Sequence, residues 1–214
     1  MNSGSITTEV KTSRKPSLLI PGVIGLWLVY TAIQSASLAQ VIAEPFASIL
    51  SLVPGVLGII ALISINFQPS NLYLRLGGIS KFGLALFVAM ILLNWFVVIP
   101  TGTYVGWRWI DALFYAPIGA ISQELFFRAV LLPVLLIAYK GRAWLALISH
   151  SILFGLWHIG TMFAGAPIPA ALAVMFVPLL FGLAWGWQVM RDRTILWSIL
   201  HHSLLLFIMT FYTW

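Results

Sequence analysis

The stretch FASILSLVPGVLGIIALISINF, from Phe46 to Phe67, carries no charged side chain over a length that can cross a lipid bilayer. A transmembrane helix needs about 20 apolar residues to span a hydrocarbon core about 30 Å thick. Similar runs recur along the chain, in which 61% of the 214 residues are hydrophobic and 7% are charged. Soluble domains carry about 25% charged residues. The sequence therefore predicts an all-α, polytopic integral membrane protein rather than a water-soluble domain.

Hydropathy predicts a bundle of about seven transmembrane helices. The fourth apolar stretch is too long for one straight span, and it contains Pro117 and Gly119. We expect it to begin with a kinked or interfacial piece and to continue as a helix from about Ile118. The predicted spans are Leu18–Gln40, Phe46–Phe67, Phe82–Ile99, Asp111–Tyr139, Ala143–Phe163, Ala170–Met190 and Ile195–Thr213.

The distribution of basic residues predicts the orientation of these spans. Residues 1–16 are polar and basic, and we expect a disordered cytoplasmic tail there, followed by a single transmembrane domain over residues 17–214. Nine basic residues lie in the tail and in the loops on the same side, whereas Arg108 is the one basic residue in the loops on the other side. Cytoplasmic loops are enriched in Lys and Arg. We therefore expect a cytoplasmic N-terminus and a C-terminus on the opposite side.

The overall charge and the absence of cysteine narrow the possible partners and chemistry. The net charge of +6 follows from the loop residues that set topology, so it does not indicate nucleic-acid binding, and the expected partners are membrane lipids. The chain has no cysteine, which excludes disulfides, thiol catalysis and cysteine-based zinc sites.

Six ionisable residues lie inside the predicted spans, where such residues are costly and usually functional. Glu124 and Arg128 are spaced i, i+4, so they share one helix face. One interpretation is a structural ion pair that ties helices together. The other is a carboxylate that Arg128 keeps ionised, ready to act as a base or a metal ligand. The six residues are Glu124, Arg128, His150, His158, His201 and His202.

Depth in the membrane indicates which of these groups can meet. Glu124 and His158 each lie 16 residues from the basic loop that joins their helices, or roughly 24 Å at 1.5 Å per residue. His202 lies only roughly 14 Å deep by the same rise, so either tilt absorbs the difference or His202 lies nearer His150. His201 and His202 point about 100° apart, so one of them is expected to be structural, as is His150.

One carboxylate and two or three imidazoles can thus converge between helices. Such a group can activate water directly as a general base or through a bound metal. Zinc accepts two histidines and a carboxylate with one position open, so Glu124, His158 and His202 would be the ligands if a divalent metal is used. The spacing alone does not require a metal.

Three motifs in order resemble the CAAX prenyl protease and bacteriocin-processing (CPBP) family, the type II CAAX-protease-like membrane proteins formerly called Abi. The segments are QELFFRAVLLP, LFGLWH and SILHHSLLLF, between residues 116 and 207. The family pattern is EExxxR, then FxxxH, then HxxxN or HxxxB. The resemblance implies functional roles for Glu124, Arg128, His158 and His202, with His201 as the second choice for the last position.

Two positions depart from that pattern. Gln123 stands where the family has its first glutamate, the group usually assigned to activate water, and Leu206 stands where an asparagine is expected. Glutamine cannot accept a proton at neutral pH, so Gln123 would position water or the scissile carbonyl. Leucine cannot donate a hydrogen bond to an oxyanion.

The resemblance implies an intramembrane endopeptidase that hydrolyses a hydrophobic or membrane-bound peptide, in a prokaryotic inner membrane. Gln123, Glu124, Arg128, His158 and His202 are its expected catalytic residues. The alternative is a catalytically impaired pseudoprotease that keeps the scaffold to bind a peptide, lipid or partner, as a scaffold or immunity protein. The departures at Gln123 and Leu206 favour this alternative.

Overall fold

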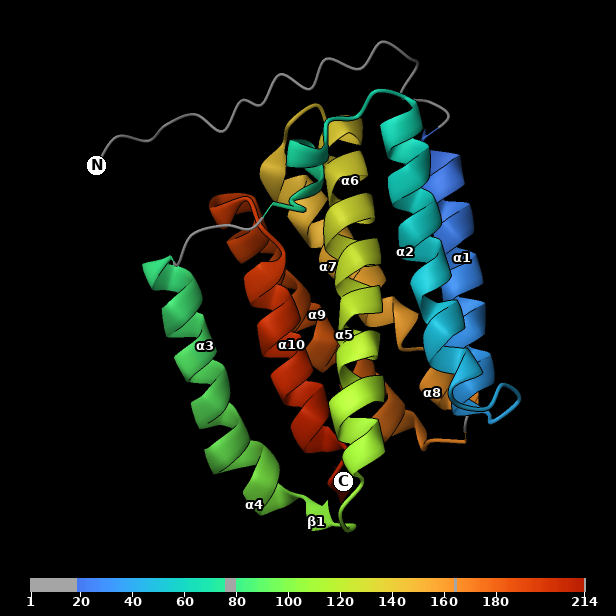
Figure 1. The fold of residues 1–214 in the computed structure, drawn as a ribbon, viewed down its shortest axis with the longest axis vertical. Helices are drawn as coiled ribbons and strands as arrows, with labels where there is room; N and C mark the ends of the chain where they lie inside the picture. The colour runs from blue at the N-terminus through green and yellow to red at the C-terminus, as the bar shows by residue number, and fades with distance from the viewer. Residues whose placement is uncertain (1–18, 76–79, 164, 214) are drawn as a thin grey trace.

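The computed structural model describes residues 19–75, 80–163 and 165–213, and within these ranges the chain is a bundle of membrane-spanning helices (Figure 1). Six helical runs in the described part are long and apolar enough to cross a membrane, and a seventh, Leu196–Met209, is shorter. This confirms the predicted all-α membrane bundle. The predicted tail at residues 1–16 lies outside the described residues.

Several spans are built from more than one helical segment. The first two are α1 (Leu19–Leu38) and α2 (Phe46–Ser64), followed by the short 3₁₀ helix η2 (Pro69–Leu72). The third joins α3 (Lys81–Leu93), the π-helical turn η3 (Asn94–Val98) and α4 (Ile99–Thr101). The fourth joins η4 (Asp111–Tyr115), α5 (Ala116–Glu124), η5 (Leu125–Leu131) and α6 (Leu132–Ala138). The last elements are α7 (Ala143–Trp157), α8 (Gly160–Phe163), α9 (Ile168–Asp192) and α10 (Leu196–Met209).

Near Pro117, where the sequence predicted a kinked or interfacial piece, the fourth span changes from π-helical to α-helical winding. It runs as one continuous helix from Asp111 to Ala138. Pro117 lies in the first turn of α5, directly after the π-helical turn η4. A proline is tolerated at the first turn of a helical segment, where its missing N–H costs least. The proline is therefore accommodated by a local change in helical winding.

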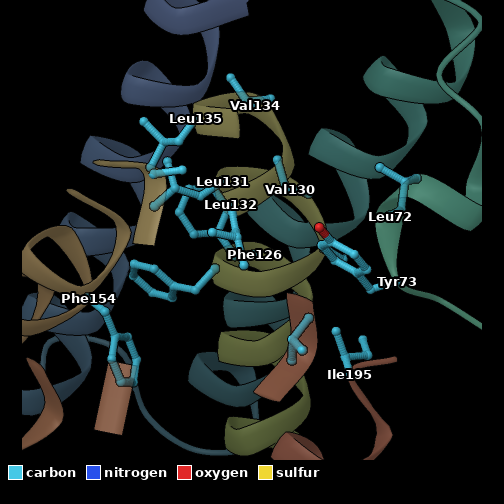
Figure 2. Close-up of a cluster of buried hydrophobic side chains, with 14 of the residues drawn as sticks. Leu72, Tyr73, Phe126, Val130, Leu131, Leu132, Val134, Leu135, Phe154 and Ile195 are labelled. Carbon is cyan, nitrogen blue, oxygen red and sulfur yellow. The ribbon is translucent and has the colours of Figure 1, made fainter. Parts of the chain in front are cut away.

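This fourth span is also the central element of the bundle. Most of it is buried, whereas the other spans are mainly exposed on their outer faces. Figure 2 shows apolar side chains of η5 and α6, among them Phe126, Val130 and Leu132, packed with Phe154 of α7 and with Leu72 of η2. Around it stand α1 and α2 on one side and α10 on the other (Figure 1).

The outer faces of the remaining spans suit a hydrocarbon environment. Large apolar side chains such as Ile60 of α2, Leu84 of α3 and Phe176 of α9 are exposed. A soluble protein rarely leaves so many apolar side chains in contact with solvent. With the length and composition of the helices, these faces identify the chain as an integral membrane protein.

Small residues allow α7 and α9 to pack closely. A Cβ added at Gly155 would lie 2.6 Å from the carbonyl oxygen of Met175, and one at Gly186 would lie 2.6 Å from Leu147 Cδ1. Interfaces between membrane helices are commonly built on glycine for this reason. The backbones of α7 and α9 therefore lie close together.

One end of the bundle is tied by a short antiparallel ribbon. Strand β1 (Thr103–Tyr104) pairs with strand β2 (Tyr212–Thr213), with Tyr104 opposite Tyr212. The ribbon joins the chain just before the fourth span to the chain just after α10. The fourth span begins at the ribbon and α10 ends there. Its segment α5 and the helix α10 therefore lie antiparallel and side by side.

Candidate active site

Glu124 and Arg128 form a fully buried ion pair inside the fourth span. Glu124 is the last residue of α5 and Arg128 lies in the π-helical segment η5, with Arg128 Nη1 3.1 Å from Glu124 Oε1. Both side chains have no exposed surface. The contact predicted from the i, i+4 spacing is thus present. π-Helical segments are rare and often occur at functional sites.

Aromatic rings cover the guanidinium group of Arg128. Its Cζ lies 4.2 Å from the ring centroid of Phe154 on α7 and 5.4 Å from that of Trp185 on α9. Cation–π contacts of this kind gain strength when water is excluded. Arg128 is therefore held by one carboxylate and two rings from neighbouring helices.

His202 of α10 completes a three-residue cluster. Its Nδ1 lies 2.8 Å from Glu124 Oε1, and with the carboxylate ionised this nitrogen donates the hydrogen bond. The His202 ring lies against the indole of Trp185, with centroids 4.8 Å apart. His202 therefore lies at the level of Glu124, and the alternative, in which it lies at a different level nearer His150, is wrong.

The adjacent histidine, His201, faces another helix. Its ring stacks on Phe87 of α3 with centroids 5.5 Å apart, and neither ring nitrogen has a hydrogen-bond partner among the described residues. The geometry thus favours His202 over His201 for the contact with Glu124. This is the divergence expected for consecutive helical residues.

His158 lies near this cluster without touching Glu124. It ends α7, and its Nδ1 lies 3.0 Å from the carbonyl oxygen of Phe154, so this nitrogen carries the proton and donates it. The ring is half-buried, and it lies within electrostatic range of His202 and Arg128. Phe154 of α7 lies at the level of Arg128. His158 is one helical turn beyond Phe154, and Glu124 is one turn from Arg128, so His158 and Glu124 lie at a similar level, as the depth count predicted.

The two positions that depart from the family motifs are both in this region. Gln123 is buried, and its side-chain oxygen has no hydrogen-bond partner within the described chain. Leu206 lies one turn after His202 and packs toward Gly119 of α5, where an added Cβ would be 3.7 Å from Leu206 Cδ1. Leu206 thus makes an apolar contact with α5.

Tyr30 is a member of the site region that the sequence did not reveal. Its hydroxyl lies 2.7 Å from the Ser122 hydroxyl, two residues before Glu124, and its ring lies 4.8 Å from that of Trp157. The side chain is fully buried and within electrostatic range of Glu124. The sequence signal for this role was a tyrosine in the middle of the first span. Tyrosine is common in membrane helices, so this signal alone does not indicate a functional residue.

His150 lies outside the cluster. It is fully buried, its ring meets that of Phe127 edge to face at 6.2 Å, and Gly186 of α9 packs closely against it. Within the described ranges, its ring makes no hydrogen bond or ring contact with Glu124 or His202. The structural role predicted for His150 agrees with this packing.

The described residues contain no group of three or more His, Asp or Glu side chains placed to hold a metal ion. The donors that do meet are one carboxylate and one imidazole, Glu124 and His202, and His158 uses its Nδ1 within its own helix. The residues as arranged therefore do not fit a three-ligand zinc site. Glu124, His158 and His202 as metal ligands, inferred from the sequence, stay a prediction.

Comparison with known proteins addresses the ancestry of this half of the chain. No curated protein and no solved structure matches the chain. The model of the family described as "Type II CAAX prenyl endopeptidase Rce1-like" matches residues 104–208, a range that includes all three motifs and every member of the cluster. Through its C-terminal half, the chain belongs to the type II CAAX prenyl endopeptidase family.

Proposed function

We propose that the chain is an intramembrane endopeptidase that hydrolyses a peptide bond of a hydrophobic or membrane-bound peptide. The observation that carries the proposal is the fully buried carboxylate of Glu124, which meets both Arg128 Nη1 and His202 Nδ1 through one oxygen. Such a cluster is costly in a membrane, and ionisable residues there are functional by default. The cluster lies inside the range matched by the endopeptidase family model, and this supports peptide-bond hydrolysis as the reaction.

Hydrolysis needs a group that takes a proton from water as the water attacks the carbonyl carbon. The Nδ1–H of His202 donates its hydrogen bond to Glu124, so the Nε2 of His202 carries no proton and keeps a lone pair. His158 likewise uses Nδ1 toward Phe154 and keeps a lone pair on Nε2. The His202 imidazole accepts the proton from water, and the imidazolium then returns it to the leaving nitrogen as the tetrahedral intermediate collapses, with His158 as a second imidazole nearby.

The carboxylate and the guanidinium prepare the histidine for this role. Glu124 fixes the tautomer and the orientation of His202 and stabilises the imidazolium that forms. Arg128 keeps Glu124 ionised and fixed in position. Gln123 precedes Glu124, and its free side-chain oxygen can accept a hydrogen bond from the attacking water. Because no carboxylate stands at residue 123, we expect slow turnover.

The alternative is a catalytically impaired pseudoprotease that acts as a membrane binding, scaffold or immunity protein. Two observations favour it: Gln123 cannot act as a base, and Leu206 makes an apolar contact with α5 instead of offering a donor to an oxyanion. In that case the Glu124–Arg128 pair would serve only to join helices.

We further propose a prokaryotic inner membrane as the location, with the N-terminus in the cytoplasm and membrane lipids as neighbours. The excess of basic residues on one side of the bundle supports this orientation. Nothing in the cluster favours a prenylated substrate over another hydrophobic peptide.

The test is cleavage of hydrophobic peptides by purified protein in lipid bilayers, followed by mass spectrometry of the products. Wild type is compared with Gln123→Glu, Glu124→Ala and His158→Ala, each with and without a chelator. We expect slow cleavage by wild type, no cleavage by Glu124→Ala, and faster cleavage by Gln123→Glu, since a general base typically contributes 10²–10⁴-fold.

The same experiment separates the alternatives. Loss of cleavage in His158→Ala would assign a role to that imidazole, and sensitivity to chelator would show that a metal is used. Absence of cleavage by wild type and by Gln123→Glu, on peptides that another family member cuts, would favour the pseudoprotease.

A further inference from the structure

A line of unpartnered polar side chains lies between α3 and α10, apart from the Glu124 cluster. Its members are Asn94, Trp197 and His201, which together define the α3–α10 seam. The side-chain oxygen and nitrogen of Asn94, the indole nitrogen of Trp197 and both ring nitrogens of His201 are buried without a hydrogen-bond partner in the described chain. One His201 nitrogen approaches the backbone of Gly83, but not with the geometry of a hydrogen bond.

The packing contacts set these side chains in order along the seam. A Cβ added at Gly83 would lie 2.8 Å from the ring of Trp197, and Phe87, one turn later, stacks on His201. The two helices therefore run in the same direction, as Figure 1 shows for α3 at the edge of the bundle beside α10. Asn94 is seven residues beyond Phe87, or about 10 Å further along the seam.

These groups are costly where they lie. A buried polar group without a partner loses its hydrogen bonds to water and gains nothing in return, and hydrocarbon offers no substitute. Asn94 is 1% exposed and His201 is fully buried. Asn94 also begins the π-helical turn η3, and such turns are often found at functional sites. The seam thus has the features of a binding surface.

We propose that the α3–α10 seam binds the backbone of an extended peptide when α3 moves outward from α10. An extended chain inside a membrane exposes N–H and C=O groups that need partners. Asn94 offers a donor and an acceptor, His201 offers the same, and Trp197 offers a donor. Trp197 and His201 are four residues apart, or about 6 Å on a helix, close to the spacing of like groups along one edge of a strand.

The occupant is a peptide rather than a lipid because acyl chains have no hydrogen-bonding groups to match the seam. It is the substrate of the proposed endopeptidase, so this inference rests on the proposed function. His201 lies within electrostatic range of Glu124 and directly precedes His202 in the chain. A peptide held in the seam would therefore lie against α10, on the helix face next to the one that carries His202.

The outward movement of α3 is compatible with its packing. In the described part of α3 only Gly83 and Met90 are buried, and much of its surface faces outward. A helix held by few buried side chains separates at a lower cost than the central fourth span. Opening the seam therefore disturbs little of the core.

The test measures peptide binding and does not require turnover. The probe is a fluorescent apolar peptide of about 20 residues with a flexible centre, added to protein in lipid nanodiscs. A matched peptide carries N-methyl groups on alternate central amides, which removes donors and keeps the apolar surface. We expect wild type to bind the unmodified peptide about tenfold more tightly, the effect of one or two hydrogen bonds.

Two variants remove the polar atoms and keep the shape of the seam. Asn94→Leu keeps the branching and the number of heavy atoms of the side chain, and His201→Phe keeps the stacking on Phe87. We expect each to bind the unmodified peptide more weakly and to reduce its preference over the N-methylated one. Leu84→Ala, on the exposed face of α3, is the matched control and should behave as wild type.

Asn94→Leu should also melt at or above the temperature of wild type, because it removes a buried polar group that has no partner. Equal binding of the two peptides to wild type, or an unchanged preference in both seam variants, would overturn the proposal. If the preference holds but no peptide is cleaved, the seam is a peptide site and the endopeptidase activity is what fails.

Discussion

Replacing Glu124 with glutamine tests the central ion pair most simply. Glutamine keeps an oxygen that can accept the hydrogen bond from His202, and it is nearly the same size. What it removes is the negative charge that faces Arg128 at 3.1 Å, in a place where neither side chain is exposed. Arg128 cannot lose its proton to escape the cost, so the variant leaves an uncompensated buried cation.

The expected magnitude follows from that burial. Breaking a buried ion pair by removing one partner costs about 3–5 kcal/mol in soluble proteins. The rings of Phe154 and Trp185 stay against the guanidinium and keep their attraction to it, so the lower end, about 3 kcal/mol, is the reasonable value. For a chain of this length this corresponds to a fall of about 6–12 °C in melting temperature.

The assay is thermal unfolding of detergent-solubilised protein, followed by tryptophan fluorescence. The matched control is Asp111→Asn, which breaks the exposed pair with Arg108 and should cost less than about 1 kcal/mol. A double variant, Glu124→Gln with Arg128→Met, should recover part of the loss, because it removes both charges. If Glu124→Gln melted like wild type, the reasoning about an uncompensated cation would be refuted.

Three further outcomes are expected. Gln123→Glu should raise peptide cleavage by about 100-fold or more, the low end for a general base, and a decrease measured in lipid would contradict the role proposed for residue 123. Reporter fusions after Arg142 and after Trp214 should lie in opposite compartments, and a shared compartment would exclude the proposed orientation. Tyr30→Phe should lower the free energy of unfolding by about 1–2 kcal/mol through loss of the buried bond to Ser122, and an unchanged denaturant midpoint would show that this bond contributes nothing.

Much of the fold could be predicted because hydropathy reports directly on membrane helices. The runs that cross the bilayer have the right length and almost no charge, so the spans appear near their predicted bounds. The π-helical winding of η5 and the continuity of the helix through Pro117 could not be predicted. Both depend on how the fourth span packs against its neighbours, which the local sequence does not encode.

The candidate site was predictable in part for similar reasons. The contact of Glu124 with Arg128 follows from helix geometry within one segment. The choice of His202 over His201 needed the rotation of α10 against α5, and the family motif supplied what periodicity alone left open. The role of Tyr30 and the unpartnered amide of Asn94 depend on contacts between distant helices, so no local pattern indicated them.

The most direct test of the proposed activity is the rate of peptide cleavage by wild type and by His202→Gln in the same lipid bilayer. Glutamine can still hydrogen-bond to Glu124, but it cannot take a proton from water. The proposed mechanism predicts slow but measurable cleavage by wild type and a loss of at least about 100-fold in the variant, with both proteins folded. Equal rates for the two proteins, or no cleavage by wild type on any hydrophobic peptide that a family relative cuts, would contradict it.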